Sequence, residues 1–175
     1  MSFARRVIGA MRLDGTTYEE VEADPGALWQ AAAVVGGFGL AAGIGLSGGA
    51  LTVRSTLTLT AAVVIGWLSW AVIVYHVGGR LLAEAQTRTD GREVARTIGF
   101  SAAPGLFLAI VAVPIARPVT FAIVAAWMLV AMVVAVRHAL DFTHVSRAIA
   151  VCLVGWLVVA GLALATGFAF GPLVS

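Results

Sequence analysis

Five long apolar stretches, separated by short charged segments, dominate the pattern of residues along the chain. Each is close to the roughly 20 residues that an α-helix needs to cross the hydrocarbon core of a bilayer. A helix is the expected form, because the membrane interior offers backbone groups no other hydrogen-bond partners. The pattern predicts an all-α polytopic membrane bundle of about five transmembrane helices over residues 27–175. The expected spans are about 27–51, 57–79, 98–115, 119–136 and 148–170.

The first 26 residues are too polar for a span and form a separate segment, 1–26. Near its start, Phe3, Val7 and Met11 fall at positions i, i+4 and i+8, while the arginines lie largely elsewhere around a helical wheel. This spacing is typical of a short amphipathic helix that lies on an anionic leaflet. We therefore expect an interfacial amphipathic helix before the first span.

Composition excludes a soluble globular domain. The chain is 61% hydrophobic and 11% charged, with a mean hydropathy of +1.00. Soluble domains are about half apolar and about a quarter charged. The single cysteine, Cys152, lies inside an apolar stretch, which excludes an intrachain disulfide or a multi-cysteine metal site.

The arginines predict the orientation of the bundle, because positively charged residues concentrate in cytoplasmic loops. All eleven basic residues are arginines, and they lie near the ends of apolar stretches, which indicates membrane topology rather than nucleic-acid binding. Five spans place nine of them on one side and two on the other. We therefore expect a cytoplasmic amino terminus and an outside carboxyl terminus. The nine are Arg5, Arg6, Arg12, Arg80, Arg88, Arg92, Arg96, Arg137 and Arg147, against Arg54 and Arg117.

Six of these arginines form a predicted face for anionic lipid or a partner protein: Arg5, Arg6, Arg12, Arg88, Arg92 and Arg96.

The loops between spans also carry local pairing signals. Asp90 and Glu93 have the spacing of a capping box that starts the third long helix. The spacings Arg80–Glu84 and Arg137–Asp141 both predict ion pairs between residues four apart on a helix.

Small residues in the first span predict close helix packing. Gly36, Gly39 and Gly43 are spaced so that a neighbouring backbone can approach the helix closely. In the third stretch, Pro104-Gly105 predicts a kink near the start of the span.

No arrangement of residues predicts catalysis or a bound metal ion. Ser101, His138, Asp141 and His144 share the predicted cytoplasmic side, but the expected ion pair with Arg137 would occupy the aspartate. A nucleophile needs a base within hydrogen-bond reach, and no such set converges with usable spacing. We expect a protein that is not an enzyme.

Aromatic residues near the middle of the spans leave a cofactor open as an alternative. Membrane tryptophans favour the interfaces, whereas four here fall near span centres, where they either pack against the thin first span or contact a pigment or quinone. His76 and His138 are the two candidate ligands for a haem iron. We expect that the protein binds no cofactor, with a pigment, haem or quinone as the alternative. The tryptophans are Trp67, Trp70, Trp127 and Trp156.

Several segments resemble the bacterial branch of the Yip family, the Ypt/Rab-interacting five-span membrane proteins. The similar strings are Arg5-Arg6-Val7-Ile8-Gly9 with Leu13-Asp14, then Thr17-Tyr18-Glu19-Glu20-Val21-Glu22-Ala23-Asp24, Arg96-Thr97-Ile98-Gly99-Phe100-Ser101-Ala102-Ala103-Pro104-Gly105 and Val134-Ala135-Val136-Arg137-His138-Ala139-Leu140-Asp141-Phe142.

For eukaryotic members, the resemblance implies binding of small GTPases and shaping of secretory membranes. This chain lacks their longer amino-terminal region and their aspartate-leucine-tyrosine-glycine-proline string.

The expected function is therefore a scaffold or accessory protein of the bacterial inner (cytoplasmic) membrane, crossing it several times. Its expected partners are the lipid bilayer and other membrane proteins or further copies of itself, and not nucleic acid. Two alternatives stay open. One is an accessory subunit of a respiratory or photosynthetic complex that contacts pigment, haem or quinone. The other is a carrier of lipid or small molecules.

Overall fold

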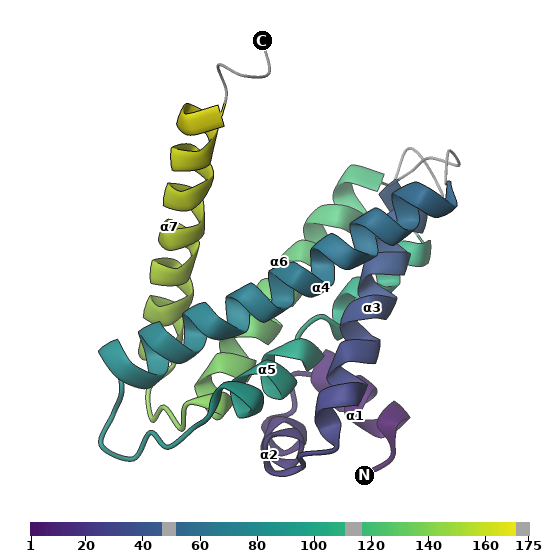
Figure 1. Cartoon of the computed structure of the whole chain (residues 1–175). Helices are drawn as coiled ribbons and strands as arrows, with labels where there is room; N and C mark the ends of the chain where they lie inside the picture. The colour runs from purple at the N-terminus through teal and green to yellow at the C-terminus, as the bar shows by residue number, and fades with distance from the viewer. Residues whose placement is uncertain (47–51, 111–116, 171–175) are drawn as a thin grey trace.

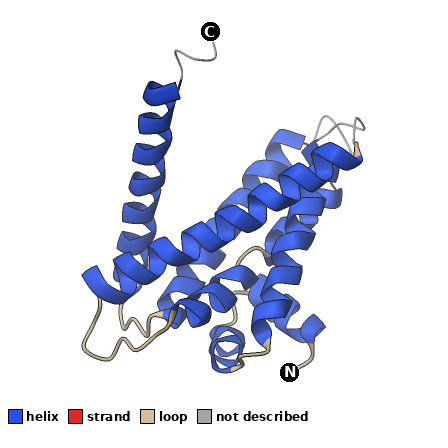
Figure 2. Cartoon of the chain, viewed as in Figure 1, coloured by secondary structure: helices blue, strands red, loops and turns tan. Residues whose placement is uncertain are grey.

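The computed structural model describes residues 1–46, 52–110 and 117–170, with Leu46, Ile110, Arg117 and residues 162–170 described by their backbone alone. This described part consists of helices and connecting turns, with no strand (Figure 2). The all-α prediction is confirmed. In chain order the elements are α1 (Phe3–Met11), α2 (Gly15–Ala23), α3 (Ala27–Leu46), α4 (Val53–His76), the π-helical turn η1 (Val77–Leu81), α5 (Gly91–Phe100), the 3₁₀ helix η2 (Ala103–Ile110), α6 (Arg117–Ala139) and α7 (Val145–Phe170).

Among the described residues, three helical segments are long and apolar enough to cross a membrane, over Ala27–Gly45, Val53–Leu81 and Pro118–Ala139. A fourth apolar helix, Val145–Gly161, is shorter within the residues whose side chains are described. These four correspond to the first, second, fourth and fifth predicted spans. The number of crossings and their direction stay predictions.

The charged connections gather at one end of the bundle (Figure 1). Helices α1 and α2, the connection 82–90 and the turn 140–144 all lie at this end, which we call the basal end. The beginnings of α4 and α6 lie toward the opposite end, as does the carboxyl-terminal end of α7. Helix α7 diverges from the other long helices as it leaves the basal end.

The prediction of a single kinked helix over 98–115 is wrong. Helix α5 begins earlier, at Gly91, because the predicted capping box is present: the Asp90 carboxylate accepts from the Glu93 N–H, and Glu93 accepts from the Asp90 N–H. It ends at Phe100, and the chain continues as η2 from Ala103. Pro104 contributes to the break, because it has no N–H to donate to the carbonyl of Phe100, four residues earlier. Residues 111–116 lie outside the described part.

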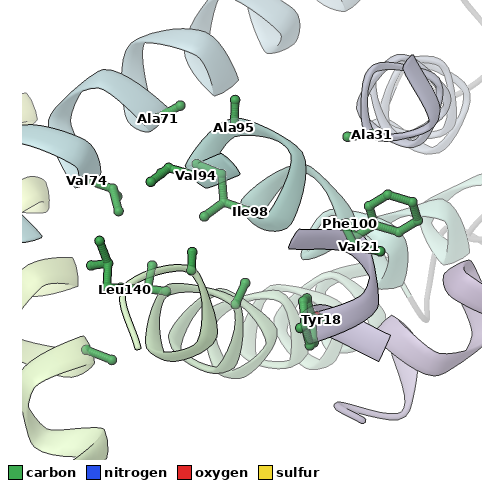
Figure 3. Packing of buried hydrophobic residues seen from close by; sticks show 14 of the residues in the cluster. Tyr18, Val21, Ala31, Ala71, Val74, Val94, Ala95, Ile98, Phe100 and Leu140 are labelled. Carbon is green, nitrogen blue, oxygen red and sulfur yellow. The ribbon is translucent and has the colours of Figure 1, made fainter. Parts of the chain in front are cut away.

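Most of the core lies at the basal end (Figure 3). Tyr18 and Val21 of α2, Ile98 of α5 and Leu140 after α6 are almost completely buried, as is Val74 of α4. A smaller cluster of Ala42, Leu108 and Val124 lies farther along α3, η2 and α6. The chain is therefore packed mainly around its charged end.

Candidate functional site

The amino-terminal segment folds onto the basal end as two helices. Asp14 caps α2 by accepting from the Thr16 N–H at 3.2 Å. The turn before it places Leu13 in the left-handed region, with φ of 62°. Helices α1 and α2 pack on each other, and both contact α5, with α1 also against η2 and α2 against α6. The segment is therefore a cap on the bundle rather than an amphipathic helix that contacts lipid alone.

Arg6 joins three helices at this cap. Its guanidinium Nη2 lies 2.8 Å from Glu20 Oε1 in α2, and its Nη1 lies 2.7 Å from Asp24 Oδ2. Nη1 also donates to Gln30 Oε1 of α3 at 3.0 Å. Arg6 is 5% exposed, but both carboxylate partners are partly exposed, so water screens the ion pairs in part.

Arg96 holds the end of α2 against α5. Its Nε donates to the Val21 carbonyl at 3.2 Å and to the Glu22 carbonyl at 2.6 Å, and its Nη2 also donates to Glu22. The last carbonyls of a helix lack partners within the helix and carry partial negative charge, which an arginine satisfies. Arg96 is 5% exposed and pairs with Glu93 at 3.5 Å.

The predicted lipid or partner face is therefore wrong for Arg6 and Arg96, because both side chains are buried in contacts that hold the cap. The sequence pattern could not show this burial, because it depends on tertiary contacts. Arg6 contacts residues of α2 and α3, and Arg96 contacts the end of α2. The other four arginines of that face, Arg5, Arg12, Arg88 and Arg92, are exposed.

Two of the cofactor candidates also contact the cap. The Trp127 Nε1–H donates to the Met11 carbonyl at 2.8 Å, and its ring stacks on Phe107. His138 stacks on Tyr18, and its Nδ1 lies 3.5 Å from Glu19 Oε1. Both side chains come from α6. This helix therefore contacts α1 through the hydrogen bond of Trp127 and α2 through the ring stack of His138.

His76, the other candidate haem ligand, contacts residues of its own helix and none of the residues that contact His138. Its Nδ1 lies 2.9 Å from the Val72 carbonyl, and its ring meets Tyr75 edge to face. Within the described ranges, no group of three or more histidine, cysteine, aspartate or glutamate residues could hold a metal ion.

Packing of the cap changes the protonation of Glu22. Burial and, after it, the nearby charges of Asp141 and Glu93 raise the pKa of this carboxyl to about 7, with a smaller contribution from Glu19, while Arg96 opposes them. The carboxyls that cap or pair respond in the other direction. Hydrogen bonds from Thr17 and Thr16 lower the pKa of Asp14, and ionic contacts lower those of Glu20 and Asp24.

The two ion pairs expected in the other basal connections do not form. Glu84 pairs with Arg147 of α7 at 3.0 Å and accepts from the Thr143 hydroxyl at 2.8 Å, while the Arg80 guanidinium lies over the Tyr75 ring. These contacts tie the connection 82–90 to the start of α7.

Arg137 likewise bonds to carbonyls instead of to Asp141. Its guanidinium donates to the carbonyls of Phe142 at 3.3 Å and Thr143 at 3.5 Å. Asp141 lies in a left-handed turn with φ of 51°, so the helix ends before the expected i, i+4 geometry exists. The i, i+4 spacing assumed that both helices continue to the acidic residue, but η1 ends at Leu81 and α6 ends at Ala139.

A cavity of about 530 Å³ lies between the long helices. It is within the range of about 300–1,000 Å³ typical of small-molecule pockets. Three of the four central tryptophans, Trp67, Trp70 and Trp156, lie on its wall, whereas Trp127 does not. The remaining wall comes from α3, α4, α5, η2 and α6: Val35, Phe38, Val63, Gly66, Ile98, Ser101, Ala102, Leu108, Phe121, Val124, Ala125, Met128, Leu129 and Met132.

The polar atoms of this wall are engaged or covered. The Trp67 Nε1–H donates to the Ala95 carbonyl at 2.9 Å, and the Ser101 hydroxyl donates to the Ile98 carbonyl at 2.6 Å. The Trp70 Nε1–H has no hydrogen-bond partner among the described residues, and neighbouring atoms bury it. Water is a poor filler, because it needs two to four polar partners.

The glycines predicted to mediate helix packing behave differently from one another. A Cβ at Gly39 would lie 3.0 Å from the Thr60 Cα of α4, so the two helices approach closely there. Gly43 is buried, while a Cβ at Gly36 would meet nothing within 4 Å. Sequence reasoning missed several tighter contacts, among them one of α5 with α3 and one of α7 with α4. A Cβ at Gly99 would lie 2.7 Å from the Ala31 Cβ, and one at Gly155 would lie 2.7 Å from the Trp70 ring.

The all-helical architecture, the apolar long helices and the charged cap define an integral membrane protein of helical-bundle class. Residues 8–166 match the Yip1 domain, and the chain therefore belongs to the Yip1 domain family. The family predicted from the resembling segments is confirmed. No curated protein and no solved structure matches the chain.

Proposed function

We propose that the protein is a non-enzymatic scaffold or accessory component of the bacterial cytoplasmic membrane, and that its basal end is the docking surface. The observation that carries this proposal is the folded cap. Arg6 and Arg96 fix α1 and α2 to the bundle through buried contacts. A surface that is ordered before binding loses less conformational entropy when a partner docks.

The charges left exposed on this end supply the contact groups. Arg5 and Arg12 lie exposed on the cap, and Arg88 and Arg92 lie exposed beside it, before and at the start of α5. Exposed charges of this kind steer association and favour an acidic partner surface or anionic headgroups. By the arginine distribution, this end faces the cytoplasm.

Cross-linking in native membranes tests the proposal. Residue-specific photo-cross-linkers placed at Arg88 and Arg92 should capture a defined protein, or a second copy of the chain, and Arg54 at the opposite end is the matched control position. A defined adduct at the basal positions, weaker at Arg54, is the expected result. A protein that stays monomeric in native membranes and gives no adduct at either end would refute the scaffold role.

A loss-of-charge series then shows whether the surface itself binds. With the photo-cross-linker placed at Arg12 instead, the double substitution of Arg88→Ala and Arg92→Ala should weaken the adduct and make the remaining association less dependent on salt, because exposed charges act through screened attraction. Arg54→Ala should change neither. Equal behaviour of all variants would contradict the assignment of the basal end as the docking surface.

A further inference from the structure

The cavity between the long helices lies at the depth of the hydrocarbon core. The segment Val53–Leu81 has its midpoint at Trp67, and its wall residues run from Val63 to Trp70. At about 1.5 Å per helical residue they lie within about 6 Å of that midpoint. A bilayer core is about 30 Å thick, so the wall faces the region of lipid chains and not of headgroups.

The cavity also opens sideways. Four of its wall residues are exposed: Gly66 of α4, Phe121 and Leu129 of α6, the latter two by 46% and 51%, and Trp156 of α7 by 55%. Near the basal end α7 is held against α4, where Gly155 meets the Trp70 ring and Val151 packs beside Gly78. Farther out α7 leaves the bundle (Figure 1), so no further helix of the described chain covers this side of α4 and α6.

We propose that the cavity binds one hydrocarbon chain of a bilayer phospholipid, whose headgroup stays at the membrane surface. The chain enters between α4 and α6 on the side of α7, and it contacts Trp67, Trp70 and Met128. This inference requires only that the helices lie in a bilayer, and it does not depend on the scaffold role.

The wall chemistry favours a plain chain over a ring with polar groups. A quinone carbonyl or a pigment amide placed in this cavity would lose its hydrogen bonds to water or headgroups, and the wall offers no accessible donor in return. The Trp67 N–H and the Ser101 hydroxyl are already bonded within the protein, and the Trp70 N–H is covered. None of the wall residues is a histidine or a charged residue that could ligate a metal.

The volume argues against a helix as the occupant. A helix about 10 Å across and 30 Å long fills roughly 2,400 Å³, several times the 530 Å³ that is present. A helix of a partner or of a second copy could therefore cover the mouth but not fill the cavity. A single extended chain fits such a space and makes the many weak contacts that stabilise apolar packing.

Two glycines provide a matched pair of variants. Gly66 lies on the cavity wall, and a Cβ there would meet nothing within 4 Å. Gly161 in α7 also has open space around its Cβ, but it lies outside the wall. Gly66→Leu therefore adds apolar side-chain volume at the cavity wall from a Cβ that meets no neighbouring atom, while Gly161→Leu makes the same chemical change elsewhere. Ala125→Phe blocks the cavity from the opposite wall on α6 and serves as a second, independent variant.

The experiment uses the full chain in nanodiscs that contain a phosphatidylglycerol with a diazirine in the middle of one acyl chain. After irradiation, mass spectrometry maps the adducts to residues. The wild type and Gly161→Leu should carry adducts on cavity residues such as Val63 and Met128, and Gly66→Leu and Ala125→Phe should lose most of them. Adducts on the exposed residue Leu153 of α7 should be equal in all four proteins, which controls for folding and reconstitution.

Three results would overturn the proposal. Adducts confined to the outer surface would show that no chain enters the cavity. Equal cavity adducts in all four proteins would show that the space being labelled is a different one. Displacement of the photolipid by an isoprenoid quinone or carotenoid, read as loss of cavity adducts when that compound is added, would assign the cavity to another occupant.

Discussion

The basal end and the middle of the bundle differ in how their polar groups and their packing are satisfied. At the basal end, buried arginines satisfy carboxylates and helix carbonyls, and the core is dense around Tyr18 and Leu140. In the middle, the helices enclose a cavity whose wall is almost purely apolar. The difference shows where each solvent acts: water and headgroups demand satisfied polar groups at the end, while lipid chains can complete packing that the protein leaves open.

Removal of the Arg96 guanidinium should break this contrast most strongly. Arg96→Ala leaves the carbonyls of Val21 and Glu22 without their donor in a buried site, and we expect a loss of about 3 kcal/mol in the free energy of unfolding. Arg92→Ala, exposed on the same helix, is the matched control and should change stability by no more than about 0.5 kcal/mol. Titration with SDS from mild detergent measures both, and equal losses would show that Arg96 does not hold the cap.

Overpacking at the border between the two regions should have the next largest effect. In Gly99→Leu the new side chain meets Ala31 and the Trp67 ring, which requires α3 or α4 to move, at a cost of about 2 kcal/mol. The control is Gly91→Leu at the start of α5, where a Cβ meets nothing within 4 Å. Thermal unfolding followed by circular dichroism compares them. Equal melting temperatures would mean that α3 and α5 are not in close contact there.

Loss of the Arg6 side chain should weaken the cap less than loss of Arg96. Its partners Glu20 and Asp24 are partly exposed, so water replaces part of the lost interaction, and we expect about 1.5 kcal/mol. Arg6→Ala should also speed limited proteolysis within 1–24, whereas the exposed neighbour Arg5→Ala should not. Protection of the segment in both variants would show that the ion pairs at Arg6 are dispensable.

The smallest expected effect is a pH dependence centred on Glu22. The pKa of this carboxyl is raised in the folded protein to about 7. Its contribution to stability is therefore fully present below its ordinary pKa near 4.5 and is lost as the pH rises through 7. After allowance for solvent screening of a half-buried group, we expect a decrease of about 1 kcal/mol between pH 5 and pH 8.

Glu22→Gln sharpens this test. The variant should unfold with little dependence on pH in that window and should be the more stable protein at pH 8. Glu19→Gln, at the exposed residue one turn earlier, should keep most of the wild-type dependence. The lowered pKa values of Asp14, Glu20 and Asp24 act only at lower pH, where protonation removes their stabilising contacts. A pH dependence unchanged in Glu22→Gln would assign it to another group.

Apolar stretches and their flanking signals predicted much of this fold. The first, second, fourth and fifth predicted spans correspond to long helices, because length and composition alone fix such elements in a bilayer. The capping box at Asp90 and Glu93 also formed as expected, since its partners are local in sequence. The prediction for the third stretch was wrong because α5 ends before Pro104, a residue that has no N–H for the helix ladder. The Ser101 hydroxyl also bonds to the Ile98 carbonyl at this helix end.

Long-range contacts account for what the pattern could not show. The i, i+4 spacing predicted partners for Glu84 and Arg137, but residues more than 50 positions away or beyond the helix end supplied the contacts. The candidate tryptophans were correctly placed near span centres, yet only the fold separates Trp127, which bonds to α1, from the three on the cavity wall. No local signal marked Arg6 and Arg96 as buried.

Hydrogen exchange of the amino-terminal segment in nanodiscs tests the central claim most directly, because a packed cap and a free interfacial helix differ in amide protection. We predict that amides of α1 and α2 exchange as slowly as those of α5, with or without anionic lipid, and that Arg96→Ala makes α2 exchange faster. Fast exchange of both helices in the wild type, slowed only by anionic lipid, would contradict the account and restore a surface-lying segment.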